Sequence, residues 1–243
     1  MRLSLSADVR SRDDVTIAFA DPGRGFSFGA NGPLDMRMAG ADTQSITAAD
    51  VVNNARRQEL EDIIYTYTGA GERYYKLIAA AIVDARSKYG QITTTEQLAG
   101  IVSLAVRGRP RKLHKTHPAT LTFQALRMFV NEELDQLESG IEQVLPYMKV
   151  GGKLAVITFH SLEAKATKKV FRRHRPTKHT APPADEMEQP ESPVDPSLPA
   201  PVPLPQEILL RPVGKLLEPS AEEVATNPRC RSAQLRVVER VEA

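Results

Sequence analysis

The sequence predicts an α/β fold in which a parallel sheet carries an inserted helical subdomain. Residues 45–106 show helical patterns one after another, with no strand between them. At 148–174, a glycine turn leads into an apolar run and then into a helical pattern. This helix–strand–helix order with short loops favours a parallel sheet. Hydrophobic residues make up 41% of the 243 residues, which is enough for a sizeable core.

Composition excludes several classes of protein. The single cysteine, Cys230, excludes an internal disulfide and a cysteine-rich zinc site, and it favours a reducing compartment. No apolar run approaches the roughly 18 residues of a membrane span. The start is rich in Arg and Ser, but Asp8, Asp13 and Asp14 argue against a transit peptide. No P-loop, G-x-G-x-x-G pattern or metal-ligand cluster occurs, and the net charge of +2 identifies no partner.

The first half of the chain begins with an apolar strand and continues into helices. The run VTIAFA at 15–20 predicts one buried strand, and a glycine-rich loop follows it. Ser45 or Thr47 is expected to cap the first helix, and Thr95 the fourth. The four predicted helices run through residue 54, then over 57–67, 72–88 and 95–106.

The second half begins with a longer helix. Apolar residues recur at steps of four and three from Thr120 to Pro146, which predicts one continuous helix. The run at 148–159 predicts a strand buried on both faces, and a helix is expected over 161–174. Residues 181–205 hold nine of the 18 prolines and no Lys or Arg, which predicts an extended, flexible insert. Two closing strands are expected at 206–213 and 233–241.

The loop RGFSFGANGPLDMRM, residues 24–38, is the first candidate site. Arg24, Asp35 and Arg37 are its candidate RNA contacts. Asp35 and Arg37 stand two residues apart, so they would bind a base edge or each other. The alternative interpretation is a structural loop that its aromatic and methionine side chains close onto the core.

A second polar set lies at the start of the long helix. Its members are Lys115, His117, Thr122, Gln124, Arg127 and Asn131. The last three step by three and four, so they share one helical face. This pattern predicts an RNA contact or, equally, a solvated face.

A third candidate site follows the predicted strand. His160 and Ser161 come at its carboxyl end, where open α/β sheets place their ligands. The helix that begins there can hold an anion at its amino end, and His160 is a possible base. No Asp partner is in view, so the His–Ser pair alone identifies no triad.

Basic residues are dense at the end of this helix. Seven Lys or Arg and no acid occur between 165 and 178, including Lys169, Arg172 and Arg173. This density favours phosphate contacts, with a solvated helix end as the alternative. Together with Lys115 and Arg127, these residues are expected to form one basic surface around the carboxyl edge of the sheet. Near the last strand, Arg229 and Arg231 contact RNA or merely flank the strand.

Four stretches in order carry a resemblance to one family. They are RGFSF with GPLDMRM, HPATLTFQALRMFVNEEL, GGKLAVITFHSLEA, and EEVATNPRCRSAQLRVVER. Together they resemble the bacterial and organellar small-subunit rRNA cytosine-N4 methyltransferases, the MraW or RsmH family. The resemblance covers about residues 21–178 and 206–241. It implies a class I, Rossmann-like methyltransferase sheet with a helical domain inserted after the GPLDMRM loop.

The resemblance also divides the chain. It implies a residual strand and loop of the methyltransferase domain at 1–41, the helical insert at 42–110, and helices and a strand of the methyltransferase domain at 111–180. The Pro-rich insert at 181–205 and the closing strands at 206–243 complete it. The family's cofactor is S-adenosylmethionine (SAM), but no residue here matches the family's SAM contacts. We therefore expect this chain alone to bind no cofactor.

Two functions follow from the resemblance. The first is a SAM-dependent methyltransferase acting on small-subunit rRNA during ribosome maturation. The second is a non-catalytic descendant that serves in ribosome assembly, which the absence of the family's SAM motifs favours. The expected partners are small-subunit rRNA or a pre-ribosomal particle, with a second protein completing the domain and no membrane. A mitochondrial location is expected, with the bacterial cytoplasm as the alternative.

Overall fold

The computed structural model describes residues 21–40, 45–110, 117–176 and 208–242. The chain forms two compact units, Met1–Glu133 and Leu134–Ala243. The predicted strand at 15–20 and the Pro-rich insert at 181–205 lie outside the described residues.

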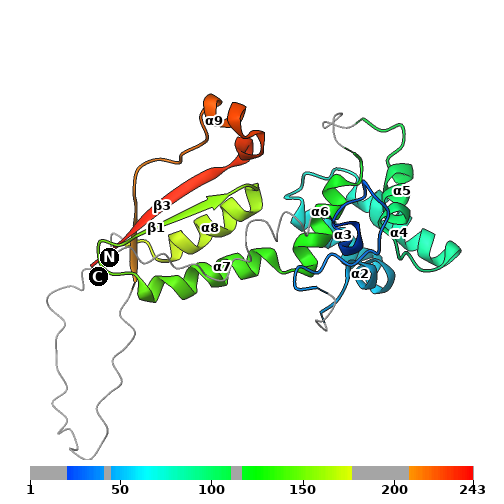
Figure 1. Ribbon diagram of the computed structural model, residues 1–243. Helices are drawn as coiled ribbons and strands as arrows, with labels where there is room; N and C mark the ends of the chain where they lie inside the picture. The colour runs from blue at the N-terminus through cyan, green and yellow to red at the C-terminus, as the bar shows by residue number, and fades with distance from the viewer. Residues whose placement is uncertain (1–20, 41–44, 111–116, 177–207, 243) are drawn as a thin grey trace, which may run out of the picture. The chain divides into compact units, whose positions relative to one another are not determined.

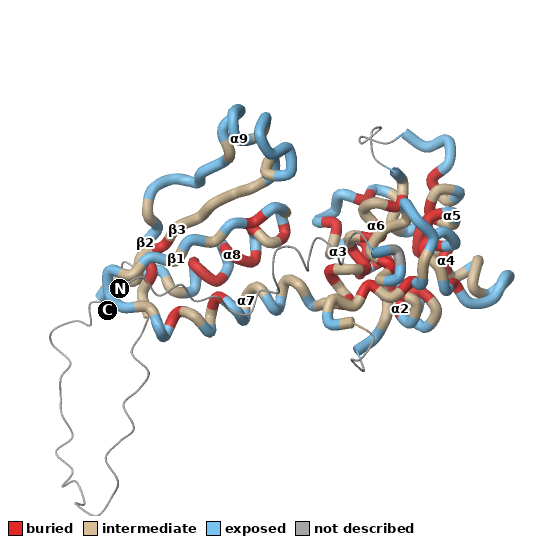
Figure 2. The backbone as a smooth tube through the Cα atoms, viewed as in Figure 1, coloured by how far each residue is buried: buried red, intermediate tan, exposed pale blue. Residues whose placement is uncertain are grey.

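The first unit is helical. Its elements are η1 (Pro22–Arg24), α2 (Ala48–Asn54), α3 (Arg57–Tyr67), α4 (Tyr75–Tyr89), α5 (Thr95–Ala105) and α6 (Thr120–Val130) (Figure 1). The four helices predicted before residue 106 are therefore present. Leu60, Ile64, Ile78, Ile82 and Leu98 are fully buried in one core, and Figure 2 shows buried positions in red along these helices.

Side-chain caps set where two of these helices begin. Thr47, one of the two caps that the sequence allowed, caps α2, and Asp50 completes a capping box. The cap of α5 is Thr94, whose hydroxyl accepts from the Gln97 amide at 3.3 Å, so the predicted cap at Thr95 is wrong by one residue. Thr95 is instead buried, with its hydroxyl 3.4 Å from the carbonyl oxygen of Ala30.

The single long helix predicted from Thr120 is instead two helices. α6 ends at Val130, and α7 (Glu133–Val144) begins after a break. Glu132 has a φ of 48°, a left-handed conformation that ends a right-handed helix. The boundary between the two units falls at this break. The apolar spacing runs through both helices, so periodicity alone did not show it.

The second unit is a small sheet with helices. In chain order it contains α7, η2 (Leu145–Tyr147), β1 (Lys153–Thr158), α8 (Ser161–Arg173), β2 (Leu209–Pro212), α9 (Ala221–Thr226), η3 (Pro228–Ser232) and β3 (Gln234–Val241). The strand order is β1-β3-β2, and both pairings are antiparallel. Within the described residues, the expectation of a parallel sheet is therefore wrong.

Apolar side chains cover one face of this sheet. Leu154 and Val156 of β1 pack on the buried cluster formed by α7, α8, β2 and β3. The other face of β1 is open among the described residues, because Lys153, Ala155 and Ile157 are exposed. The strand is thus not buried on both faces as predicted. Figure 1 shows α8 lying along one side of β1 and β3.

A membrane-crossing helix is not among the described elements, since none is both long enough and apolar enough.

Candidate functional site

The loop at residues 24–38 is held closed by contacts between its own residues. The guanidinium of Arg24 donates to the carbonyl oxygens of Arg37 at 2.8 Å and Met38 at 2.7 Å. Gly25 has a φ of 73°, and a Cβ at this position would lie 2.2 Å from the carbonyl oxygen of Pro33. Only glycine fits so close an approach. Arg24, a predicted RNA contact, is therefore part of the loop's internal structure.

Asp35 and Arg37 bind each other. The Arg37 Nε and Nη2 atoms donate to the two carboxylate oxygens of Asp35, each at 2.7 Å. The hydrogen bond from Arg37 lowers the pKa of Asp35, and this effect outweighs burial, which acts in the opposite direction. Of the two alternatives open in the sequence, a base edge or mutual pairing, the structure contains the pairing.

Asn131 joins α6 to this loop. Its side-chain amide donates to the carbonyl oxygens of Met36 and Arg127, both at 2.8 Å, and its Oδ1 accepts from the Met38 amide at 2.7 Å. Both N–H donors are used within the fold. Met36, the centre of this contact, is fully buried with a φ of 63°. The side chain of Asn131 therefore holds a strained turn in place.

Most of the other polar residues of the HPATLTFQALRMFVNEEL stretch contact partners within the fold, but the buried hydroxyl of Thr122 has no hydrogen-bond partner among the described residues. The Nδ1 atom of His117 accepts from the Ala119 amide at 3.2 Å, and its ring stacks 4.5 Å from that of Phe28. Arg127 forms a two-point ion pair with Glu133 at 2.7 and 3.0 Å. Gln124 is half-buried, with its amide nitrogen 3.9 Å from the sulfur of Met128. Lys115 lies outside the described residues.

At the carboxyl end of β1, polar side chains cap α8. The Nδ1 atom of His160 accepts from the Leu162 amide at 3.3 Å. The Glu163 carboxylate accepts from the amides of Phe159 at 2.8 Å and His160 at 3.1 Å. Glu163 thus binds the two amides just before α8, beside the helix end where the sequence predicted an anion. Ser161 is exposed as the first residue of the helix.

This end of β1 does not fit SAM within the described residues. A SAM site in an open α/β sheet needs a glycine turn after a strand and free amides at the next helix. The turn after β1 has no glycine, and Glu163 accepts from two of its amides. We therefore assign no described residue to the cofactor. No group of three or more potential metal ligands occurs in the described parts of the chain either.

The basic half of α8 lies at the opposite end of the sheet. Near the end of α8, the carbonyl oxygen of His174 accepts from the Leu210 amide of β2 at 2.6 Å. In the sheet, Leu210 of β2 lies opposite Arg240 of β3. The residue before Arg240, Glu239, lies opposite Lys153, so this part of the sheet is at the amino end of β1. The helix therefore returns along the sheet, away from His160. The expectation of a basic surface around the carboxyl edge is wrong for this helix.

Two of its predicted phosphate contacts bind acids of α7. Lys169 lies 2.9 Å from Glu138, and Arg173 lies 2.9 Å from Glu138 and 3.1 Å from Glu142. Burial would raise the pKa of Glu138, but the hydrogen bonds from Lys169 and Arg173 lower it overall. Arg172 points elsewhere and forms no ion pair among the described residues.

Arg229 and Arg231 are exposed on η3. Beside them, a cavity of about 700 Å³ lies between α9, η3 and the carboxyl half of β1. It is lined by Ile157, Leu235 and Cys230, and also by Glu222 and Glu223. The two arginines are thus near this end of the sheet, where the sequence placed a ligand.

The chain matches known proteins over most of its length. The MraW methylase family matches residues 16–241. The chain is 43% identical over 232 residues to ribosomal RNA small subunit methyltransferase H of Nitrobacter winogradskyi, covering 92% of this chain and 60% of that protein. The protein of the same name from Nitrosococcus oceani is 42% identical over 217 residues, which cover 89% of this chain and 62% of that protein. The protein of that name from Coxiella burnetii is 39% identical over 224 residues, which cover 91% of this chain and 64% of that protein.

This chain spans about three fifths of the length of these curated relatives. The matched range nevertheless covers most of both compact units and all four motif stretches. The chain therefore belongs to the MraW methylase family.

Proposed function

We propose that this chain acts in a SAM-dependent methyltransferase that modifies N4 of a cytosine in small-subunit rRNA. The observation that carries the proposal is the 43% identity over 92% of the chain to a protein named ribosomal RNA small subunit methyltransferase H. All the relatives named above carry the same name, and none supports a non-catalytic assembly role. Nothing in the comparisons supports a second protein that completes the domain.

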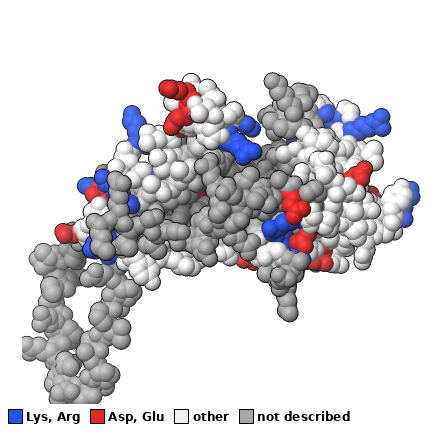
Figure 3. Space-filling view, in the orientation of Figure 1, with Lys and Arg blue, Asp and Glu red and all other residues white. Residues whose placement is uncertain are grey.

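RNA is the proposed partner of both units. In the first unit, the closed loop at 24–38 and the start of α6 would present a rigid surface to the RNA. In the second unit, Arg172, Arg229 and Arg231 are exposed cations suited to phosphate. On the face drawn in Figure 3, basic and acidic side chains are interspersed, so charge alone defines no single RNA surface there.

SAM would supply the methyl group, and its contacts belong to residues other than those described. The relatives named above are bacterial proteins, so we propose a bacterial cytoplasmic role. The mitochondrial expectation has no support.

Methyl transfer tests the proposal directly. The purified chain would be incubated with SAM labelled on its methyl carbon and with small ribosomal subunits that lack N4-methylated cytosine. Digestion to nucleosides and mass spectrometry should find the label on N4 of cytidine. Large ribosomal subunits serve as the control and should stay unlabelled. Small subunits that stay unlabelled, or label on a different nucleoside, would contradict the proposed reaction.

Titration of SAM into the purified chain separates this proposal from the expectation that the chain alone binds none. Binding in the micromolar range, measured by calorimetry, would support a transferase made of this chain. Failure to bind at millimolar SAM would contradict a transferase made of this chain alone.

A further inference from the structure

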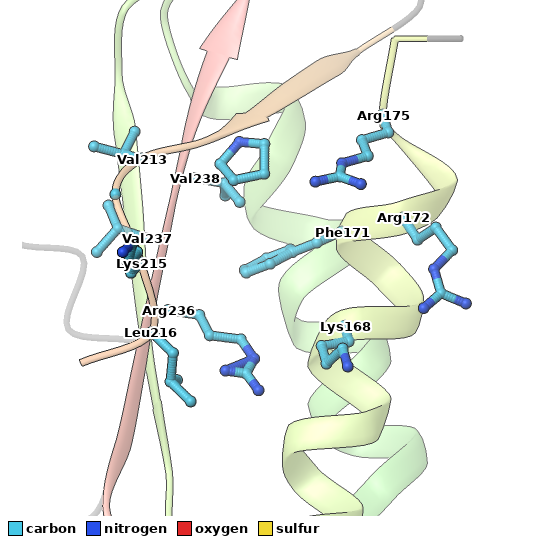
Figure 4. Close-up of a pocket in the computed structure, with 12 residues that line it drawn as sticks. Lys168, Phe171, Arg172, Arg175, Val213, Lys215, Leu216, Arg236, Val237 and Val238 are labelled. Atoms are coloured by element: carbon cyan, nitrogen blue, oxygen red, sulfur yellow. The ribbon is translucent and has the colours of Figure 1, made fainter. Parts of the chain in front are cut away.

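A small cavity in the second unit is surrounded by positive charge. It has a volume of about 230 Å³ and lies between α8, β3 and the loop that follows β2. Five Lys and Arg side chains line it, and no Asp or Glu does; they are Lys168, Arg172, Arg175, Lys215 and Arg236. In Figure 4, Arg175 and Arg236 extend from opposite sides toward the space between α8 and the sheet.

The cations of this cationic pocket differ from their neighbours on the same helix. Lys169 and Arg173 pair with Glu138 and Glu142 of α7, on another side of α8. None of the five pocket cations forms an ion pair within the part of the chain that the structure describes. Like charges gathered without a counter-ion repel one another, so the arrangement favours an anionic ligand.

The wall of the pocket is apolar and anchored. Phe171 and Val238 form its floor, and the loop after β2 forms one side. The Val213 amide donates to the carbonyl oxygen of Val237 at 2.9 Å, and Leu217 and Leu235 exchange two backbone hydrogen bonds at 3.1 and 2.9 Å. Between these anchors, Leu216 is 41% exposed and faces the pocket. The site therefore combines fixed apolar surface with charge.

The volume of the pocket and the chemistry of its lining together limit the kind of ligand that it can bind. A site for a complete drug-sized molecule has a volume of about 300–1,000 Å³, so this pocket holds only part of a larger ligand. The pocket favours a ligand that carries negative charge and also presents a flat, apolar surface. A nucleotide within a chain has both properties, whereas a free inorganic ion has only the charge. Single-stranded RNA offers a phosphate and an unstacked base together.

We propose that the cationic pocket binds one nucleotide of a single-stranded RNA segment. The phosphate would lie among Lys168, Arg175 and Arg236, with the base against Leu216. The choice of RNA rests on the proposed function. Lys168 is about 12 Å along α8 from His160 at the carboxyl end of β1, at about 1.5 Å per residue. The α8 side of the pocket is thus about two helical turns from that end of the sheet.

A matched pair of double variants tests this contact. Lys168→Gln with Arg175→Gln removes two of the cations proposed to hold the phosphate, whereas Lys169→Gln with Arg173→Gln removes two cations that are ion-paired. Both variants change the net charge equally, and their residues lie on α8 or directly after it. The probe is a fluorescent single-stranded RNA of about ten nucleotides, within the range that one binding module covers. Its affinity would be measured by anisotropy across a salt series.

The pocket variant should bind more weakly and with a flatter salt dependence. Each lost phosphate contact lowers the slope of log K against log salt by about 0.7, which is about fivefold in affinity at 0.1 M salt. The matched variant should keep the wild-type slope. Leu216→Ser should weaken binding without changing the slope, because it removes apolar contact and no charge. Duplex RNA of the same length should be bound less well by wild type than the single strand.

Several outcomes would overturn the proposal. Equal slopes for the wild type and the pocket variant would show that the pocket does not contact phosphate. If millimolar inorganic phosphate displaces the RNA and Leu216→Ser has no effect, the pocket is only an anion site. A pocket variant that loses RNA affinity in a chain without methyl transfer would uphold this inference and reject the proposed function. If the pocket variant binds RNA with normal affinity while the wild type transfers methyl groups, the proposed function would stand and this inference would be rejected.

Discussion

At the scale of single residues, the polar side chains of the GPLDMRM loop bind within the fold. Asp35 and Arg37 pair with each other, and Asn131 supplies three hydrogen bonds to the loop backbone and its own helix. A side chain that satisfies buried backbone groups is costly to replace. The shape of this loop, rather than free side-chain groups on it, is what the first unit would offer to RNA.

Asn131→Asp should destabilise the first unit by about 2 kcal/mol. The change removes both N–H donors and places a carboxylate against the carbonyl oxygens of Met36 and Arg127. Asn54→Asp is the control, because Asn54 is exposed at the end of α2. Urea unfolding of both variants measures the difference. If both lose equal stability, the bonds of Asn131 contribute nothing.

The Asp35–Arg37 pair should make stability depend on acid pH. The folded-state pKa of Asp35 is lowered, so its contribution is present above the unfolded pKa, about 3.9, and is lost as pH falls below it. Asp35→Asn should therefore be less stable than wild type at neutral pH, and the gap should narrow below about pH 4. Asp62→Asn, in an exposed contact with Gln58, is the control. A gap that stays constant with pH would contradict this assignment.

At the scale of elements, α8 has two functional sides. One side binds α7 through Glu138 and Glu142, and another lines the cationic pocket. The basic residues of α8 therefore have two roles. Some stabilise the contact with α7, and others are proposed to bind a ligand. The amino end of the helix is closed by its own Glu163.

The paired side of α8 should matter for stability alone. Lys169→Gln with Arg173→Gln should lower the unfolding free energy of the second unit only slightly, because solvent screens ion pairs of such exposed cations. The lowered pKa of Glu138 means that this contribution fades as pH falls below about 4.5. Lys168→Gln with Arg175→Gln should leave stability unchanged, because neither cation forms an ion pair among the described residues. Chemical unfolding at neutral and acid pH checks both, and equal losses would remove the distinction between the two sides.

At the scale of the whole molecule, each unit has its own hydrophobic core. Ile64 is fully buried in the first core, and Leu145 is fully buried in the second. Since neither buried cluster includes residues of the other unit, each should unfold as its own cooperative transition.

Core substitutions should therefore act on one unit at a time. Ile64→Ala and Leu145→Ala should each cost about 2–5 kcal/mol, and each should lower only the transition of its own unit. Scanning calorimetry, with hydrogen exchange to assign the transitions, is the measurement. A single transition that both variants lower equally would show that the units fold as one.

The sequence by itself determined the local structure. The helices of the first unit followed from apolar spacing and from caps such as Thr47, and the strand at 153–158 followed from its apolar run and glycine turn. These signals are local, because a helix or a strand is formed by neighbours in the chain. The four motifs likewise indicated the family, because each is a short run of consecutive residues.

Only the tertiary structure decided the directions of the helices, the pairing of the strands and the partners of the charged side chains. The sequence did not show the break at Glu132, the antiparallel pairing of β1, or the return of α8 that carries its basic residues away from His160. Nor did it show that Lys169 and Arg173 pair with acids of α7, more than 30 residues earlier in the chain. Such choices depend on contacts between residues far apart in sequence, and no local pattern records which distant acid a lysine will meet.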